Sequence, residues 1–262
     1  TLEPRPDMSR RLLVPLVFAC LLLAGWEGAV RLWLADSPFV PAPSSILRWL
    51  AEALLDGSLI EATWVTLRRL SLGFLAGASL GLVLGALCAR SRTVRDALGW
   101  LALGLQTLPS VCWVPLAILW FGQGEGAVLF VTVMGTVWSV LLAVEESVLS
   151  VPPLYIRAAQ TMGSRGWHLW LAVLLPAALP GILAGMKQGW AFAWRSLMAA
   201  EIFVVILSGY GLGSMLHDGR ELLRMEQVVG VMSIIVLVGL LADLALFGPI
   251  ERWLRRTRGL GN

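Results

Sequence analysis

The sequence predicts an all-α polytopic membrane protein with six membrane-spanning helices and one helix outside the membrane. Of its 262 residues, 58% are hydrophobic and only 14% are charged, whereas a soluble domain carries about 25% charged residues. A helix needs about 20 apolar residues to cross the hydrocarbon core of a bilayer, and six stretches meet this length. The predicted spans are residues 12–34, 67–89, 98–122, 127–149, 181–207 and 228–250.

The flanks of the first two spans add detail. The first span is too long for a signal peptide and lacks a small-x-small cleavage site, so we expect it to remain as a membrane helix. Residues 44–66 are semi-polar, with apolar side chains at helical spacing, and are expected to lie along the membrane surface. Arg68 and Arg69 follow, and their long side chains are expected to reach the lipid headgroups.

Prolines mark the third span and the segment between the fourth and fifth. Pro109 would loosen the hydrogen bonding of the third span without ending it. In the loop at about 150–168, Pro152 and Pro153 predict a helix start. The helix is expected to run towards Gly163, and Gly166 predicts its break. Pro176 and Pro180 are expected to stop the amphipathic piece that follows, before the fifth span begins.

Charge predicts the orientation. Arginines are concentrated in segments 1–11, 90–95, 157–165 and 252–258, which lie on the same side of the membrane if six spans are present. The positive-inside rule therefore predicts that both termini and the 150–168 loop face the cytoplasm. The net charge of +3 comes from residues beside the spans, so we expect lipid and no nucleic acid as a partner. No separate soluble domain is visible, and residues 1–262 are predicted to form a single domain.

Two charged residues in the fifth span are candidates for function, because a charge at this depth costs at least about 2.5–3.5 kcal/mol. Arg195 is either a counter-charge for an anion in the pathway or a structural partner for a buried carboxylate or for backbone carbonyls. Glu201 is expected to tether a neighbouring helix or an outer gate. Gly211 and Gly213, in the glycine-rich turn that follows, are candidates for the same gate or for a contact with another protein.

Small polar residues form a stripe in the fourth span. Thr132, Thr136 and Ser139 recur at helical spacing, and Gln106 lies beside Pro109 in the third span. Such residues either line a pathway or pack helices together. The three cysteines are far apart and read as apolar residues, so no metal site is expected. No phosphate-binding loop or buried catalytic constellation is apparent, and the chain is predicted not to be an enzyme.

The 150–168 loop carries a recognisable motif. Arg157, Ala158, Ala159 and Gly163 have the spacing R-A-A-x-x-x-G, and nine residues later V-L-L-P ends at Pro176. This resembles the EAA loop of type I ABC-importer permeases, whose pattern is E-A-A-x-x-x-G, nine residues, then I-x-L-P. Arginine replaces the leading glutamate here. The resemblance implies that these five residues couple the permease to an ATPase, which a cytoplasmic helix at residues 152–167 contacts.

Residues 109–122, 194–201 and 211–213 are similar to the permease branch for taurine, aliphatic sulfonates, nitrate and bicarbonate. The resemblance covers residues 12–256 and implies the MetI-like fold, in the bacterial inner membrane. It also implies a second copy of the permease, ATPase subunits that hold ATP and Mg²⁺, and an extracytoplasmic binding protein that delivers a small anion. A neutral or aromatic nutrient, or a stand-alone secondary transporter, remains an alternative.

Overall fold

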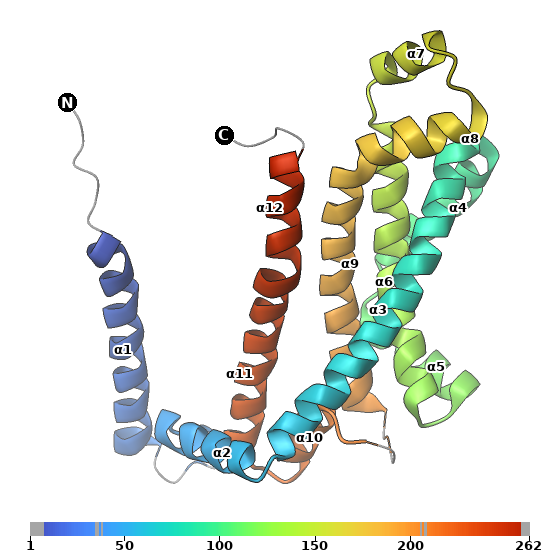
Figure 1. Cartoon of the computed structure of the whole chain (residues 1–262). Coiled ribbons are helices and arrows are strands. Elements are labelled where there is room, and N and C mark those ends of the chain that lie inside the picture. Colours follow the sequence, from blue (N-terminus) through green and yellow to red (C-terminus); the bar gives the residue numbers. More distant parts are fainter. Residues whose placement is uncertain (1–7, 35–36, 38, 205, 207–208, 258–262) are drawn as a thin grey trace. The chain divides into compact units, whose positions relative to one another are not determined.

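The computed structural model describes residues 8–34, 37, 39–204, 206 and 209–257, without the side chains of 8–16, 255 and 257. Every regular element in this part of the chain is helical (Figure 1). In chain order they are α1 (Met8–Trp33), α2 (Pro43–Leu55), α3 (Ser58–Arg90), α4 (Arg92–Gln106), η1 (Ser110–Cys112), α5 (Trp113–Phe121), α6 (Glu125–Leu149), α7 (Pro153–Thr161), α8 (Gly166–Leu169), η2 (Trp170–Leu174), α9 (Leu175–Phe203), α10 (Leu212–Glu221), α11 (Met225–Ala242), η3 (Asp243–Phe247) and α12 (Gly248–Thr257). η1 is a 3₁₀ turn, whereas η2 and η3 are π-helical.

Contacts divide the chain into two compact units. The first unit is formed by residues 1–60 and 215–234, and the second by residues 61–214 and 235–262. The prediction of a single domain therefore stays a prediction. All the sites described below lie within the second unit.

The prediction of an all-α membrane protein is confirmed. Among the described residues, four helical runs are long and apolar enough to cross a membrane, namely α3, α6, the run at 166–203 and the run at 225–254. A fifth exists if α4 and η1–α5 are counted as one span. The first predicted span falls on α1, where the side chains of 12–16 lie outside the described part, as do residues 205 and 207 of the fifth span.

The prediction of one continuous helix at 98–122 is wrong. α4 ends at Gln106, and η1–α5 leaves it at an angle of 101°. Pro109 has an extended ψ of 137° and caps the 3₁₀ turn. Because proline has no backbone N–H, it cannot continue the hydrogen-bond ladder of α4, so the chain turns here.

The surface helix is shorter than predicted, because α2 ends at Leu55 and residues 58–66 already belong to α3. Gly57 has a φ of +81°, which favours glycine and breaks the helix. The Asp56 carboxylate then accepts a hydrogen bond from Ser58 N at 2.8 Å, and the Ser58 hydroxyl and N–H lower the pKa of Asp56. The Asp56 carboxylate therefore binds the first backbone N–H of α3.

Pro176 and Pro180 do not stop the helix before the fifth span, contrary to the prediction. The helical run continues from Gly166 to Phe203 through the π-helical turn η2. Pro176 lies in the first turn of α9, directly after η2, and Pro180 lies inside α9. A π-helical turn shifts the hydrogen-bond register locally, so the missing N–H of Pro176 need not break the helix.

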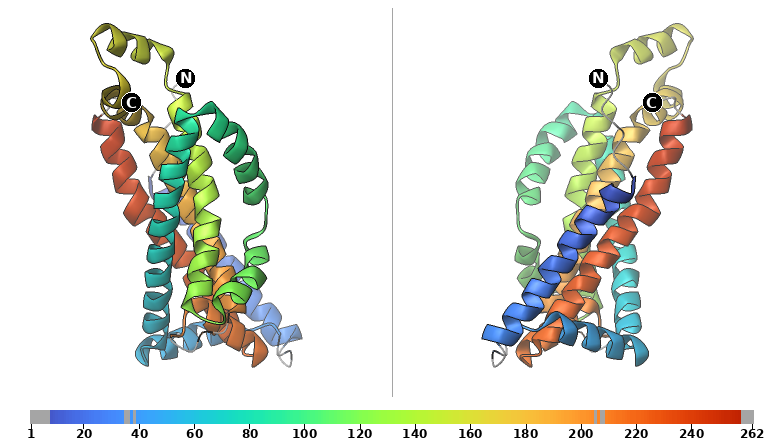
Figure 2. Two further views of the ribbon diagram at one scale, coloured as in Figure 1. Left: turned by 90° about the vertical axis from the view of Figure 1, so that its right-hand side faces the viewer. Right: turned by 90° about the vertical axis from the view of Figure 1, so that its left-hand side faces the viewer.

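Glycines pack the three long helices of the second unit. A Cβ added at Gly77 of α3 would lie 2.7 Å from Thr136 Cβ of α6, and one added at Gly189 of α9 would lie 2.6 Å from Val140 Cγ2. Such stripes let helix backbones approach closely in a membrane, and Figure 2 shows α3, α6 and α9 side by side. The glycines that contact α6 in this way are Gly73, Gly77, Gly81, Gly85, Gly181, Gly185 and Gly189.

Candidate functional site

The predicted coupling segment forms α7, a separate helix between α6 and the run that leads into α9 (Figure 1). Pro152 is the N-cap residue and Pro153 occupies the first turn, where the missing N–H of proline costs no hydrogen bond. Figure 1 shows α7 beyond the ends of α6 and α9, on a connection of its own. The local sequence thus determines both the presence and the start of this helix.

Gly163 ends α7 in a Schellman motif. Its φ is +89°, its N–H donates to Gln160 O at 3.0 Å, and Ser164 N donates to Ala159 O at 2.9 Å. These two bonds satisfy carbonyls that the helix end would otherwise leave unpaired. Apart from its two chain neighbours, no described residue has an atom within 4 Å of a Cβ built at Gly163. The backbone conformation, and not crowding inside the chain, therefore explains the glycine.

The surface of α7 is largely exposed and partly apolar. Leu154 is 71% exposed and Met162 is 82% exposed, and Tyr155 is also exposed. Leu154, Ala158 and Met162 are four residues apart and therefore share one face of the helix. Ala158 and Arg157 are exposed, whereas Ala159 is buried.

Not all residues of the predicted motif belong to this surface. Pro176 lies half-buried at the start of α9, on a different element from α7. Ala159 is buried within its own chain and cannot offer its side chain to a partner. The exposed face of α7 thus retains Arg157 and Ala158 from the motif.

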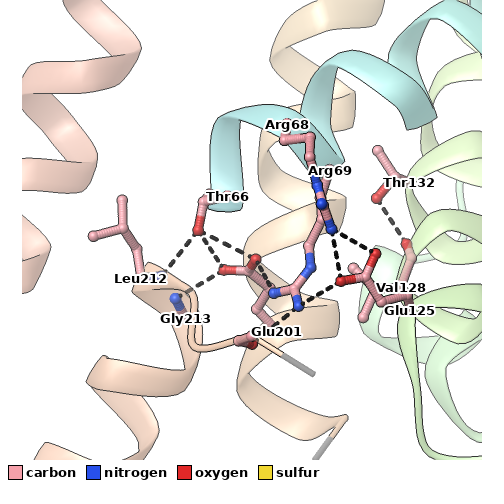
Figure 3. A network of polar contacts seen from close by, with 10 residues as sticks. Thr66, Arg68, Arg69, Glu125, Val128, Thr132, Glu201, Leu212 and Gly213 are labelled. Atoms are coloured by element: carbon pink, nitrogen blue, oxygen red, sulfur yellow. Dashed lines mark hydrogen bonds and ion pairs between the residues drawn. The ribbon is translucent and has the colours of Figure 1, made fainter. Parts of the chain in front are cut away.

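Glu201 lies near the end of α9 in a buried polar network (Figure 3). Its carboxylate accepts hydrogen bonds from Arg69 Nη1 at 2.9 Å, Thr66 Oγ1 at 2.9 Å and Gly213 N at 3.0 Å. The Thr66 hydroxyl in turn accepts a hydrogen bond from Leu212 N at 2.9 Å. One carboxylate thereby connects α3, α9 and the first residues of α10.

Arg69 completes the network, and it corrects the expectation that its side chain reaches the headgroups. The residue is 0% exposed, and its Nη2 donates to Glu125 at 3.1 Å and to Gly209 O at 3.0 Å. Arg68 also pairs with Glu125, at 3.0 Å. Glu125 lies in the first turn of α6, where the helix dipole favours a carboxylate.

Gly211 and Gly213 pack directly against Glu201. A Cβ built at either residue would clash with the Glu201 side chain. Both residues are therefore glycine because the chain passes too close to the carboxylate for a side chain. The structure thus brings together Glu201, Gly211 and Gly213, and adds Thr66, Arg69 and Glu125, which sequence reasoning missed. In the sequence, the only available signal for this network was the pair of adjacent arginines, Arg68 and Arg69, at the start of an apolar span.

Thr132 and Thr136 are fully buried in α6. Their hydroxyls donate to the backbone carbonyls of Val128 and Thr132, at 2.8 and 2.7 Å, and their side chains contact the glycine stripe of α3. Neither residue lines any of the three cavities that Gln106, Ser139 or Arg195 border. Their placement favours helix packing over lining a pathway.

Gln106 and Ser139 line one cavity of about 660 Å³ between α4, α6 and α9. Gln106 also lines a second cavity of about 240 Å³, which contains Arg195 and the aromatic side chains of Trp113, Trp138 and Phe192. The volume of the larger cavity lies in the range typical of small-molecule sites. Three of the predicted pathway residues, Gln106, Ser139 and Arg195, thus border cavities.

Arg195 has no carboxylate partner among the ion pairs of the described residues. Its Nε donates to Ala191 O at 3.1 Å, and its guanidinium lies 4.6 Å from the centroid of the Phe192 ring, a cation–π distance. Lys187, one of the other charged residues of α9, is paired with Asp243 at 2.9 Å. Arg195 therefore keeps its charge available to the 240 Å³ cavity and to a third cavity, of about 590 Å³, which it borders together with Lys187 and Asp243.

Comparisons with known proteins place the chain in a family. The profile described as "Binding-protein-dependent transport system inner membrane component" matches residues 81–258. The chain is 31% identical to a putative ABC transporter permease of Methanocaldococcus jannaschii, over 90% of this chain and 88% of that protein. It is 30% identical to the taurine transport system permease protein TauC of Escherichia coli K12, over 94% of this chain and 90% of that protein.

A solved structure supports the same fold. The structure titled "Inward facing conformations of the MetNI methionine ABC transporter" matches with a TM-score of 0.65 at 19% identity, covering 75% of this chain and 95% of that chain. At this identity the match shows the MetI-like fold alone. The chain therefore belongs to the family of inner membrane components of binding-protein-dependent transport systems, and it is the permease subunit that forms the translocation pathway.

Proposed function

We propose that this permease translocates a small anion and that α7 is the element through which an ATPase drives it. A second copy of the chain would complete the pathway, and an extracytoplasmic binding protein would deliver the solute. Both termini and α7 would face the cytoplasm of a bacterium, as the distribution of arginines predicts. ATP and Mg²⁺ would be held by the ATPase.

The observation that carries the proposal is the exposed surface of α7. Leu154, Tyr155 and Met162 place apolar side chains on a short helix that is largely exposed. Exposed apolar patches mark sites of contact with other proteins or with membranes. The arginines at 157 and 165, together with the R-A-A-x-x-x-G spacing, favour a protein surface on the cytoplasmic side.

The proposed coupling is mechanical. α7 is connected to α6 at one end and, through α8 and η2, to α9 at the other. A partner that moves α7 would therefore act on both of the helices that pack around the 660 Å³ cavity. Such a movement changes the state of the pathway only if the contacts of α7 differ between the two states.

Two observations support a small anion. Relatives include TauC, the putative aliphatic sulfonates transport permease SsuC of Bacillus subtilis, at 30% identity, and the nitrate import permease NrtB of Synechocystis, at 25%. In this chain, Arg195 borders two cavities without a carboxylate partner among the described residues. An unpaired arginine at this depth favours an anionic group.

The test is co-purification of the ATPase with α7 variants. Leu154→Asp and Met162→Asp place a charge on the exposed apolar face and should abolish retention of the ATPase, because burying an unpaired carboxylate at an interface is costly. Leu222→Asp is the matched control, since Leu222 is a similarly exposed leucine that follows α10. Retention of the ATPase by both α7 variants would contradict the proposal.

A further inference from the structure

The 660 Å³ cavity has an acidic wall, which would not attract a solute that carries negative charge alone. Its polar lining consists of Gln106, Ser139, Glu145, Glu146, Ser150 and Gln188, and no lysine or arginine borders it. Glu145 and Glu146 are adjacent on α6. The cavity thus offers acceptor oxygens and negative charge.

Two of these acceptors lack partners in the described part of the chain. Ser139 is 3% exposed, and its hydroxyl makes no hydrogen bond. Glu145 Oε2 is also buried without a partner. Buried polar groups are almost always hydrogen-bonded, so two unpaired acceptor-capable groups on one cavity indicate that a ligand supplies the missing donors.

Arg95 forms an ion pair with Glu145 but leaves the Oε2 atom of Glu145 without a partner among the described residues. Its Nε lies 3.5 Å from Glu145 Oε1, beyond the usual length of a charge-assisted hydrogen bond. The guanidinium also donates to the carbonyls of Cys88 and Ala89, each at 3.3 Å. Glu145 therefore remains able to bind a second cation.

The neighbouring cavity has the opposite charge. It holds Arg195, and both cavities are bordered by Gln106. A solute that moves past Gln106 thus meets a cationic surface on one side and an acidic surface on the other. This arrangement suits a small molecule that carries both charges.

We infer that the acidic cavity binds the ammonium group of the translocated solute, so that the solute is a small zwitterion. Glu145 and Ser139 would accept hydrogen bonds from the ammonium, and Glu146 would add negative charge. This inference rests on the proposed function, and it narrows the class of anion to those that also carry an amine.

Two probes that differ in one group test the inference. Taurine and isethionate share an ethanesulfonate, but taurine carries an ammonium where isethionate carries a hydroxyl. A reporter cysteine is introduced by Leu142→Cys, at a residue that lines the cavity. The exposed Cys20 and Cys112 are first replaced by serine, whereas the buried Cys88 is kept. The rate at which a maleimide labels the full transporter in membrane vesicles is then measured with each probe.

We expect taurine to protect the reporter at concentrations at least about tenfold lower than isethionate, as one hydrogen bond to a charged group would produce. Glu145→Gln should remove this difference, and Glu146→Gln, at an exposed residue, should reduce it. Glu52→Gln in α2, also exposed, is the control and should preserve it. Because Glu146 is exposed, its variant tests the inference even if Glu145→Gln fails to assemble.

Equal protection by both probes, or stronger protection by isethionate, would overturn the inference. The inference would also be overturned if the maleimide did not label the reporter cysteine under any condition, because a second copy of the chain would then fill the cavity. ATPase retention is measured on the same vesicles. If the ATPase is retained while taurine gives no preference, this inference fails and the proposed function stands.

Discussion

Arg69 and Glu201 form a buried ion pair, with Arg69 Nη1 2.9 Å from Glu201 Oε1 and neither side chain exposed. The two residues are 132 positions apart in the chain. Both are further bonded, Arg69 to Glu125 and Gly209, and Glu201 to Thr66 and Gly213. The pair therefore connects the start of α3 to the segment that links α9 with α10.

Removal of one partner of this pair should be strongly destabilising. Arg69→Ala or Glu201→Ala leaves an uncompensated buried charge, which costs about 3–5 kcal/mol. The thermal unfolding midpoint of the purified protein, followed by the fluorescence of its 13 tryptophans, measures the effect. The double variant Arg69→Ala/Glu201→Ala should be less destabilised than the sum of the single variants. Additive effects would show that the two residues are not coupled.

Side chains added at the glycines beside Glu201 should displace its carboxylate. Gly211→Ala and Gly213→Ala each place a methyl group against that side chain, and such overpacking costs about 1–3 kcal/mol. Gly28→Ala is the control, because no atom lies within 4 Å of a Cβ built there. Midpoints that are unchanged for all three variants would contradict the placement of the 209–213 turn.

The glycine stripe of α3 should be equally intolerant of larger residues. Gly77→Val would force α3 away from Thr136 of α6 and is expected to lower the unfolding midpoint clearly. Gly104→Val in α4 is the matched control, since a Cβ there meets no atom within 4 Å. An equal loss of stability in both variants would assign the effect to the β-branched side chain itself and not to the packing against α6.

Sequence reasoning predicted best those features that depend on local chemistry. α7 begins where Pro152 and Pro153 predict it, because proline restricts the backbone of its own neighbourhood. It ends earlier than the predicted break at Gly166, because Gly163 already takes the left-handed conformation that closes the helix. Sequence reasoning missed the bend after Gln106, and it predicted a helix end at Pro176 where the helix in fact continues. Both depend on how a proline is accommodated, by a 101° turn in one case and by a π-helical turn in the other.

The buried network was predicted only in part. Glu201 and its two glycines were recognisable, because an acid in an apolar span requires a partner. The partners of Arg69 lie 56 and 132 residues away, and hydropathy treats an arginine near a span as its end. The glycine stripes escaped notice for the same reason, since the residues that they contact belong to other helices.

The most direct test of the account is the ratio of solute uptake to ATP hydrolysis when Gly163 is replaced. Gly163→Val forces a β-branched residue into a left-handed conformation, at a cost of about 1–2 kcal/mol, and would disrupt the Schellman motif that ends α7. Gly163→Asn is the control, because asparagine tolerates this region. Both are measured in proteoliposomes that contain the ATPase and the binding protein.

We predict that the valine variant inserts into the membrane and supports ATP hydrolysis, while its solute uptake per ATP falls about tenfold. A free-energy cost of about 1–2 kcal/mol corresponds to a factor of this size. The asparagine variant should transport at a rate close to that of the parent. If the valine variant instead transports as well as the parent protein, α7 is not the element that couples ATP hydrolysis to translocation.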